Sequence, residues 1–153
     1  MSKAFTRESD DLPEKPLTRP IQSGQKDYLT PDGAQRLGDE LKQLSESPER
    51  ESPPAKQRIS QLQEVLGTAE VVPVPAQPWE QVLFGASVTV RDAHGVESRY
   101  RIVGREEADL DRNWVSWTSP IARALLKSRV GQQIRFRIPA GEHVWDIVRI
   151  EYH

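Results

Sequence analysis

Three glutamates close together in the chain are the residues whose type and spacing first suggest chemistry. Glu46, Glu49 and Glu51 lie in the stretch SESPERES, between two segments with a helical pattern. Carboxylates gathered on one loop could hold Mg²⁺ through one or two oxygens and bridging water molecules. The alternative is a solvated turn that its charges keep soluble, and Arg50 lies among the acids. We favour the solvated turn and predict no metal at this loop.

Histidine and cysteine offer little for catalysis or metal binding. His94, His143 and His153 lie far apart, in a predicted turn, at the start of a predicted strand and at the C-terminus, so we expect solvated side chains. The sequence contains no cysteine, which excludes disulfides, thiolate metal sites and cysteine nucleophiles. No nucleophile arrangement, P-loop or dinucleotide fingerprint occurs. We therefore expect no cofactor and no bound metal.

The composition limits the classes of partner. The 153 residues carry a net charge of −2, so the chain as a whole gives no electrostatic support for strong direct binding of nucleic acid. The stretch MSKAFTRESDDLPEK has no apolar run typical of a signal peptide, and no segment approaches the roughly 20 apolar residues that span a bilayer. We expect a soluble cytoplasmic protein without a membrane contact. The four tryptophans are expected in the core and rim of a small sheet rather than around a small-molecule substrate.

The first half of the chain predicts a short helical hairpin behind a polar tail. Residues 1–27 are polar and proline-rich, which is typical of a disordered tail. A first helix begins with Thr30 as N-cap and Pro31 in the first turn and ends near residue 47. A second helix begins near Ala55 and ends near Gly67.

Prolines at positions 48, 53 and 54 prevent one continuous helix. Residues 28–72 are therefore predicted to form a short antiparallel coiled coil. The apolar residues expected to pack together are Ala34, Leu37, Leu41 and Leu44 on the first helix and Ile59, Leu62 and Leu66 on the second.

The second half predicts a sheet with one helix. Residues 73–81 hold three prolines and read as an extended linker, and from residue 82 apolar residues alternate as in strands. A hairpin with its turn at Gly95, a charged loop over 105–113 and a short strand WVSW precede a helix. That helix has Ser119 as N-cap and ends before Gly131, and two further strands follow. We expect four residues of this segment to face the sheet: Ile121, Ala124, Leu125 and Val130. Residues 82–153 therefore predict an α+β domain with a mostly antiparallel sheet.

Several phrases in this second half, in order, resemble the Gre family of bacterial transcript-cleavage factors, and GreB more than GreA. They are LFGASVTV, GVESRYRIVG, SPIARALLKSRVGQ and IPAGEHVWDIVRIEY, while YLTPDGAQRLGDEL resembles the start of the family's coiled coil. The resemblance implies a coiled coil followed by an FKBP-like domain that docks on RNA polymerase at the rim of its secondary channel. In the family, the coiled coil places an acidic pair near the polymerase Mg²⁺, and the polymerase hydrolyses its own backtracked RNA. The factor itself is then not an enzyme.

The chain departs from the family at the tip of the coiled coil. The family's Asp-x-x-Glu-Asn tip motif is absent, and both predicted helices are shorter by several turns. A helix of about 16 residues spans roughly 24 Å, so Glu46, Glu49 and Glu51 would stop short of the catalytic metal. In this respect the chain resembles short-coil Gre relatives such as the regulator of nucleoside diphosphate kinase. We expect a polymerase-binding elongation regulator that does not stimulate cleavage. The alternatives are a cleavage factor that uses the tip glutamates and, by fold analogy, an FKBP-like prolyl isomerase.

The family's docking segment carries over in part. Ser119 and Pro120 match the family's Ser-Pro-x-Ala/Gly segment, whereas Thr118 replaces the Asp or Asn that often precedes the serine. Loss of a carboxylate there would weaken a buried polar contact by about 1 to 3 kcal/mol. The residues expected to bind the polymerase are Thr118, Ser119, Pro120, Ile121, Ala122 and Arg123.

Overall fold

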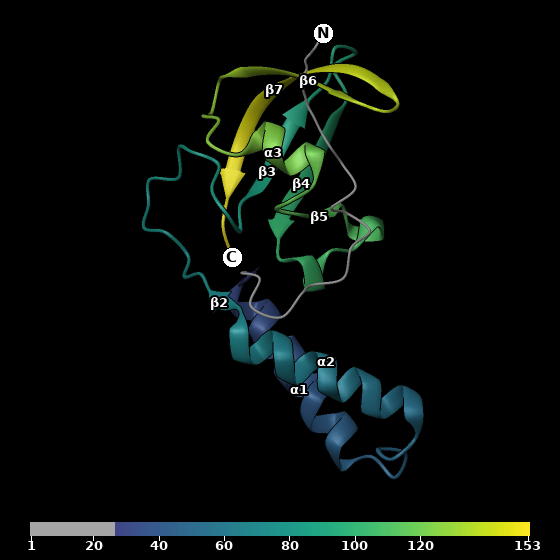
Figure 1. Cartoon of the computed structure of the whole chain (residues 1–153). Helices are drawn as coiled ribbons and strands as arrows, with labels where there is room; N and C mark the ends of the chain where they lie inside the picture. The colour runs from purple at the N-terminus through teal and green to yellow at the C-terminus, as the bar shows by residue number, and fades with distance from the viewer. Residues whose placement is uncertain (1–26) are drawn as a thin grey trace, which may run out of the picture.

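The computed structural model describes residues 27–153 and shows a helical hairpin that projects from one end of a sheet domain (Figure 1). Of the disordered tail expected for residues 1–27, residues 1–26 lie outside the described residues. Within residues 27–153, no helix is long and apolar enough to span a bilayer. The α+β class expected from the sequence is confirmed.

The hairpin consists of α1 (Pro31–Glu46) and α2 (Pro53–Thr68), each of 16 residues. The Thr30 hydroxyl accepts a hydrogen bond from the Gly33 amide at 3.0 Å, so the predicted N-cap is confirmed. Leu37 and Leu62 are buried between the helices, as their spacing predicted, and Val65 joins them although no pattern singled it out. A small apolar core thus holds the two helices together.

The start of α2 differs from the prediction. The helix begins at Pro53 rather than near Ala55, and both Pro53 and Pro54 lie in its first turn. A proline is tolerated there because the first turn leaves its amides without an intrahelical partner. Ser52 supplies the N-cap by accepting a hydrogen bond from the Ala55 amide. Prolines 53 and 54 therefore start the second helix instead of delaying it.

A two-stranded parallel sheet closes the base of the hairpin. Strand β1 (Tyr28–Leu29) precedes α1, strand β2 (Glu70–Val71) follows α2, and the two are paired in register. The amide of Val72 donates to the carbonyl of Leu29 at 2.9 Å. The sequence reading had not predicted these two short strands, and they bring both ends of the hairpin to one place.

The sheet domain has the five strands β3 (Ser87–Arg91), β4 (Glu97–Val103), β5 (Trp114–Ser116), β6 (Gln133–Ile138) and β7 (Gly141–Glu151). Their order in the sheet is β5-β4-β3-β7-β6, and every pairing is antiparallel except β4 with β5. Gly95 has a φ of 82° in the turn between β3 and β4, where a residue without a side chain fits best. The predicted strands and turns are confirmed.

Helix α3 (Pro120–Leu125) is the one α-helix that the structure describes in this domain. Leu125 is fully buried, and Ile121 and Ala124 pack against the same core. The helix ends well before Gly131, and Val130 is 47% exposed. The prediction that Val130 faces the sheet was therefore wrong, because Lys127 adopts a φ of 72° directly after the helix and turns the chain away.

Candidate functional site

The predicted docking segment, residues 118–123, lies where β5 leads into α3. Ser119 is the N-cap of α3, with its hydroxyl accepting a hydrogen bond from the Ala122 amide at 3.2 Å. The Thr118 hydroxyl lies 2.7 Å from the Ser116 hydroxyl, and the Thr118 amide donates to the same Ser116 oxygen at 3.1 Å. The segment is thus held in one conformation by its own hydrogen bonds.

One of the six predicted contact residues is not available at the surface. Ala122 is fully buried against the core of the sheet domain, so its side chain cannot contact a partner, and this part of the prediction is corrected. Arg123 is exposed, and Thr118, Ser119, Pro120 and Ile121 are partly exposed.

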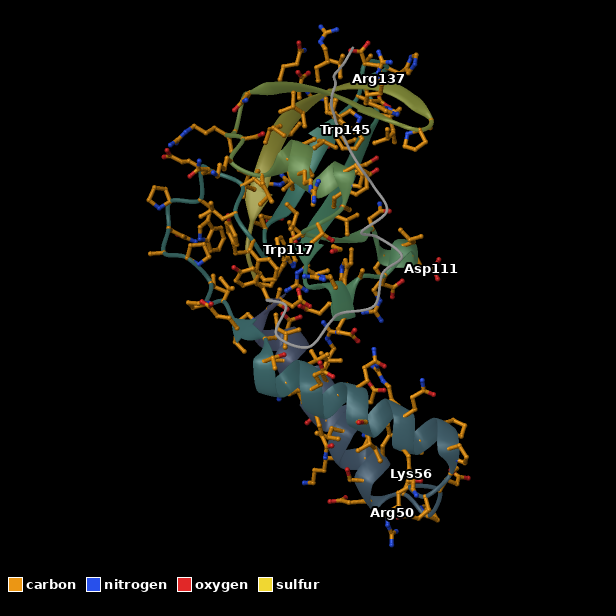
Figure 2. The ribbon with its side chains drawn as sticks, viewed as in Figure 1. Arg50, Lys56, Asp111, Trp117, Arg137 and Trp145 are labelled. Carbon is orange, nitrogen blue, oxygen red and sulfur yellow. The ribbon has the colours of Figure 1, made fainter. Side chains whose placement is uncertain are left out.

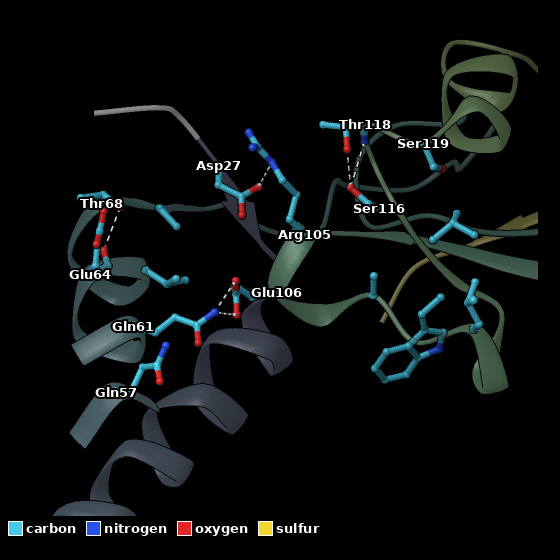
Figure 3. A pocket seen from close by; sticks show the side chains of 16 residues that line it. Asp27, Gln57, Gln61, Glu64, Thr68, Arg105, Glu106, Ser116, Thr118 and Ser119 are labelled. Atoms are coloured by element: carbon cyan, nitrogen blue, oxygen red, sulfur yellow. Dashed lines mark hydrogen bonds and ion pairs between the residues drawn. The ribbon is translucent and has the colours of Figure 1, made fainter. Parts of the chain in front are cut away.

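A cleft of about 690 Å³ separates the docking segment from α2 (Figure 3). Gln57, Gln61 and Glu64 of α2 lie on one side, and Thr118 and Ser119 lie on the other. Leu110, which is 85% exposed, belongs to the lining of this cleft. The hairpin and the sheet domain therefore both contribute to the surface around residues 118 and 119.

Asp27 is a buried acid at this cleft that sequence reasoning missed. The sequence placed residue 27 in the polar tail, but Asp27 is only 2% exposed. The indole nitrogen of Trp117 donates to Asp27 Oδ1 at 2.8 Å, and Arg105 lies 3.7 Å from the same oxygen. Asp27 thus anchors the start of the hairpin next to the docking segment.

The junction between hairpin and sheet domain centres on Glu107. The stretch 105–113 had been predicted as a charged loop, but it contains two short 3-10 helices, η2 (Arg105–Glu107) and η3 (Leu110–Arg112), and Glu107 is 3% exposed. Its carboxylate accepts hydrogen bonds from the Thr30 amide at 2.9 Å, from the Gly104 amide at 3.1 Å and from the Thr30 hydroxyl. A carboxylate from the sheet domain therefore binds the N-cap residue of α1, at the helix end where negative charge is favoured.

Two glycines make room for this junction. A side chain at Gly33 would overlap the Glu107 carboxylate, and one at Gly104 would overlap the carbonyl of Tyr28. In the sequence alone, Gly33 stands out as a residue that weakens a helix by roughly 1 kcal/mol. Its position early in the helix is the signal that could have revealed a close approach.

Ion pairs surround the Glu107 contact. Arg101 donates two hydrogen bonds to Asp32, at 3.0 and 2.7 Å, and this guanidinium lowers the pKa of Asp32 to about 2. Arg58 of α2 pairs with Glu40 of α1 at 2.8 Å and with Glu106 of the sheet domain at 3.4 Å. The same guanidinium lowers the pKa of Glu40. The direction of the hairpin relative to the sheet domain is therefore set by buried and half-buried polar contacts.

The acidic tip lies at the far end of the hairpin from this junction (Figure 2). Glu46, Glu49 and Glu51 are all exposed, and Lys56 lies 3.2 Å from Glu51. The Arg50 amide donates to the Ser47 carbonyl at 3.2 Å, which makes the tip a tight turn. Among residues 27–153, no cluster of three acids, histidines or cysteines has a geometry that could hold a metal ion.

Among the described residues, no histidine and no aromatic residue except Trp114 lines the cleft. His94 lies in the turn between β3 and β4, and the ring of His143 stacks on Phe136 at 5.6 Å. Trp145 is buried and stacks on Tyr100 at 5.2 Å. Trp117 packs against the core of the sheet domain, as expected for a residue at its rim, whereas Trp114 lines the cleft.

The chain is similar to transcription elongation factors over most of its described length. The family description "Transcription elongation factor, GreA/GreB, C-term" matches residues 77–152. GreB of Pseudomonas aeruginosa is 49% identical over 78 residues, which cover 51% of this chain and 46% of that protein. GreA of Hyphomonas neptunium is 37% identical, covering 71% of this chain and 73% of that protein. GreA of Magnetococcus marinus is 33% identical, covering 81% of this chain and 96% of that protein.

Solved structures of related proteins are similar at lower identity. GreA factor homolog 1 (Gfh1) of Thermus thermophilus is 24% identical with a TM-score of 0.44, covering 81% of this chain and 97% of that chain. A GreA/GreB factor from Nitrosomonas europaea is 26% identical with a TM-score of 0.45, covering 82% and 98%. The chain spans 46% of the length of the Pseudomonas relative and 57% of GreB from Xanthomonas axonopodis pv. citri.

Proposed function

The chain belongs to the GreA/GreB family of transcription elongation factors, and from this membership we propose that it binds bacterial RNA polymerase without stimulating transcript cleavage. The sheet domain docks at the rim of the secondary channel, and the hairpin occupies the mouth of the channel. A protein with this role works in the cytoplasm, beside the polymerase. It competes with cleaving Gre factors for the same docking position.

The length of the hairpin is the observation that carries this proposal. Each helix has 16 residues and therefore spans about 24 Å. The alignment with GreA of Magnetococcus marinus runs over 151 positions but covers 81% of this chain, about 124 residues, so about 27 positions of the relative have no counterpart here. If these positions were shared between the two helices of the arm, each helix would be shorter by about 13 residues, or roughly 20 Å.

A gap of this size matters because of the chemistry that the family supports. Two-metal hydrolysis of a phosphodiester needs carboxylates that contact the second metal or its water directly. Glu46, Glu49 and Glu51 are the acids nearest the tip, but Glu51 already pairs with Lys56 at 3.2 Å. The sequence has one asparagine, Asn113, which lies far from the tip, so the family's Asp-x-x-Glu-Asn motif is absent. A short arm without that motif favours docking without catalysis.

The docking segment supports the polymerase as the partner. Thr118, Ser119 and Pro120 lie at the surface, their conformation is fixed by the Ser116 and Ser119 hydroxyls, and the cleft beside them provides a concave surface. A partner segment that contacts residues 118–121 would also touch α2 across the cleft.

The test uses backtracked elongation complexes with end-labelled RNA. We expect no cleavage with the protein alone and a dose-dependent loss of cleavage when it is titrated against a cleaving Gre factor. Direct binding to core polymerase is measured in parallel. Absence of binding to core polymerase would refute the proposal, and cleavage by the protein alone would refute its second half.

An active cleavage factor is the second candidate, because three exposed glutamates occupy the tip. If these acids act on the metal, the triple variant E46Q/E49Q/E51Q abolishes stimulation. The matched control D39N/E97Q/D111N removes the same number of exposed carboxylates away from the tip. We expect both variants to behave as the unchanged protein does.

A prolyl isomerase is the weaker candidate and depends on fold analogy alone. The aromatic rings of the sheet pack on one another, as Tyr100 and Trp145 do at 5.2 Å, and none of the described cavities is lined by these two rings. We expect the rate of isomerisation of a proline peptide to stay at its uncatalysed value in the presence of the protein.

A further inference from the structure

A second groove, of about 390 Å³, lies where the chain after β2 passes the sheet domain. The rings of Tyr28, Phe84 and Trp117 form one part of its lining. The Tyr28 ring lies 5.8 Å from the Phe84 ring and 5.1 Å from the Trp117 ring, measured between centroids. We call this hollow the aromatic groove. Its other lining residues are mostly apolar: Glu70, Val72, Pro73, Pro75, Leu83 and Leu126.

Large apolar side chains stay exposed in and beside the aromatic groove. Leu83, in its lining, is 41% exposed. Val71 is 48% exposed and Val74 is 42% exposed, and both are chain neighbours of lining residues. Three of the six large apolar residues that are exposed within residues 27–153 therefore belong to this part of the surface. An exposed apolar patch of this kind marks a binding site.

The described part of the chain begins at this groove. Tyr28 lines the groove, and Asp27 is held in place by the indole nitrogen of Trp117 at 2.8 Å. The residues that precede Asp27 therefore start beside the groove. Residues 22–26 can span at most about 18 Å, and Gly24 favours a turn. The chain before residue 22 can thus fold back onto the groove.

Residues 12–21, with the sequence LPEKPLTRPI, have the composition that an aromatic groove binds. A proline-rich segment favours the polyproline II conformation. Such a segment docks in aromatic-lined grooves because its conformation is already formed and little entropy is lost. Lys15 and Arg19 against Glu14 give this segment a net charge of +1. That sign is opposite to the charge of Glu70, the one charged residue in the described lining.

We propose that residues 12–21 bind in the aromatic groove of the same molecule, in an extended polyproline II conformation. The short connection to Asp27 gives the segment an effective concentration of about 1 mM at the groove, so modest contacts are sufficient. This inference goes beyond the proposed function and does not depend on it. The bound segment would lie beside the docking segment, because Trp117 of the groove directly precedes Thr118.

The first experiment titrates a labelled peptide, LPEKPLTRPI, into full-length proteins. The test variant L17S/I21S removes two apolar residues from the proposed segment, and the control A4S/F5S removes two from elsewhere before Asp27. We expect the peptide to bind the test variant about 2- to 10-fold more tightly than the unchanged protein, because the tethered segment no longer competes. The control should bind the peptide as the unchanged protein does.

The groove itself is tested in the L17S/I21S background. Leu83→Gln should abolish binding of the peptide, because Leu83 lines the groove. Leu110→Gln is the matched control, since it makes the same change at an exposed leucine outside the groove. It should leave the affinity for the peptide unchanged.

The second experiment places one spin label on the full-length chain. The chain has no cysteine, so T18C carries the label at one position, inside the proposed segment. We expect the amide signals of Leu83 and Leu126 in the groove to broaden. The signal of Val96, in the turn beyond the other end of β3, should stay sharp. L17S/I21S in the labelled chain should restore the signals of Leu83 and Leu126.

Three results would overturn the inference. The first is equal affinity of the peptide for the unchanged protein and L17S/I21S, or absence of broadening at Leu83. The second is broadening in an isotope-labelled chain that carries no spin label, after mixing with the labelled one, which would show that the segment of one copy binds another copy. The third is loss of polymerase binding by Leu83→Gln without broadening at Leu83, which would assign the groove to the polymerase. The peptide and spin-label readouts need no polymerase, so failure of the proposed function leaves them decisive.

Discussion

Two glycines on the same helix should respond in opposite ways to the same substitution. Gly33 and Gly38 both lie in α1, and replacement of glycine by alanine in a helix gains about 1 kcal/mol of intrinsic stability. A Cβ at Gly38 would meet nothing within 4 Å. Gly38→Ala should therefore raise the free energy of unfolding by about 0.5 to 1 kcal/mol.

Gly33→Ala should destabilise the protein although its intrinsic helix propensity improves. A Cβ there would overlap the Glu107 carboxylate and lie 2.8 Å from Thr30 Oγ1. Glu107 is 3% exposed and holds the Thr30 and Gly104 amides, so it cannot move without leaving buried polar groups unpaired. Disruption of a buried charged contact costs about 3 to 5 kcal/mol. After the gain in propensity, a net loss of about 2 to 4 kcal/mol is expected.

Urea denaturation followed by circular dichroism measures both variants, and Gly38→Ala is the matched control. A second readout is the distance between the tip and the sheet domain. The chain has no cysteine, so spin labels on S47C and R137C would report that distance alone. Gly33→Ala should broaden the distance distribution and Gly38→Ala should not. Equal stability of the two variants would refute the assignment of Glu107 as the residue that fixes the hairpin.

Three further predictions follow from the described contacts. The pKa of Asp32 falls from 3.8 to about 2 in the folded state, so the stability that its carboxylate contributes is present above pH 4 and is lost as the pH falls towards 2. Asp32→Asn should reduce the fall in the free energy of unfolding over this pH range, measured by urea denaturation. The reduction should be under about 1 kcal/mol because the Asp32 side chain is half exposed. Ser119→Ala removes the N-cap of α3 and should cost about 1 kcal/mol in thermal unfolding. Leu62→Ala empties a fully buried position and should cost about 2 to 5 kcal/mol, with faster amide exchange in α1 and α2.

Features that depend on neighbouring residues could be predicted from the sequence. Thr30 and Ser119 each cap the helix that follows, and each is succeeded by a proline. Both helix starts can therefore be located from a few consecutive residues. The alternation of exposed and less exposed residues along β6 likewise follows from a period of two. The places of residues 118–123 and of the hairpin tip in the fold could therefore be predicted from the sequence.

Features that depend on distant residues could not be predicted in this way. Glu107 accepts a hydrogen bond from Thr30, the N-cap of α1, which lies 77 residues earlier, and Asp27 accepts a hydrogen bond from Trp117, 90 residues later. In the sequence, Glu107 is one of several acids in a charged stretch, and Asp27 is the last residue of a polar stretch. A carboxylate can be buried when the fold brings amide and guanidinium donors to it. A single sequence does not show which distant donors will meet which carboxylate.

The parallel pairing of β1 with β2 makes the hairpin an insert with both ends anchored at one place. Adding the same number of heptads to α1 and α2 would lengthen the arm by about 10 Å per heptad and keep the apolar seam between the helices in register. The contacts of Glu107, Arg101 and Arg58 lie at or near the base and would stay unchanged. A series of such chains would show how long the arm must be, measured from the sheet domain, before its tip acquires an activity.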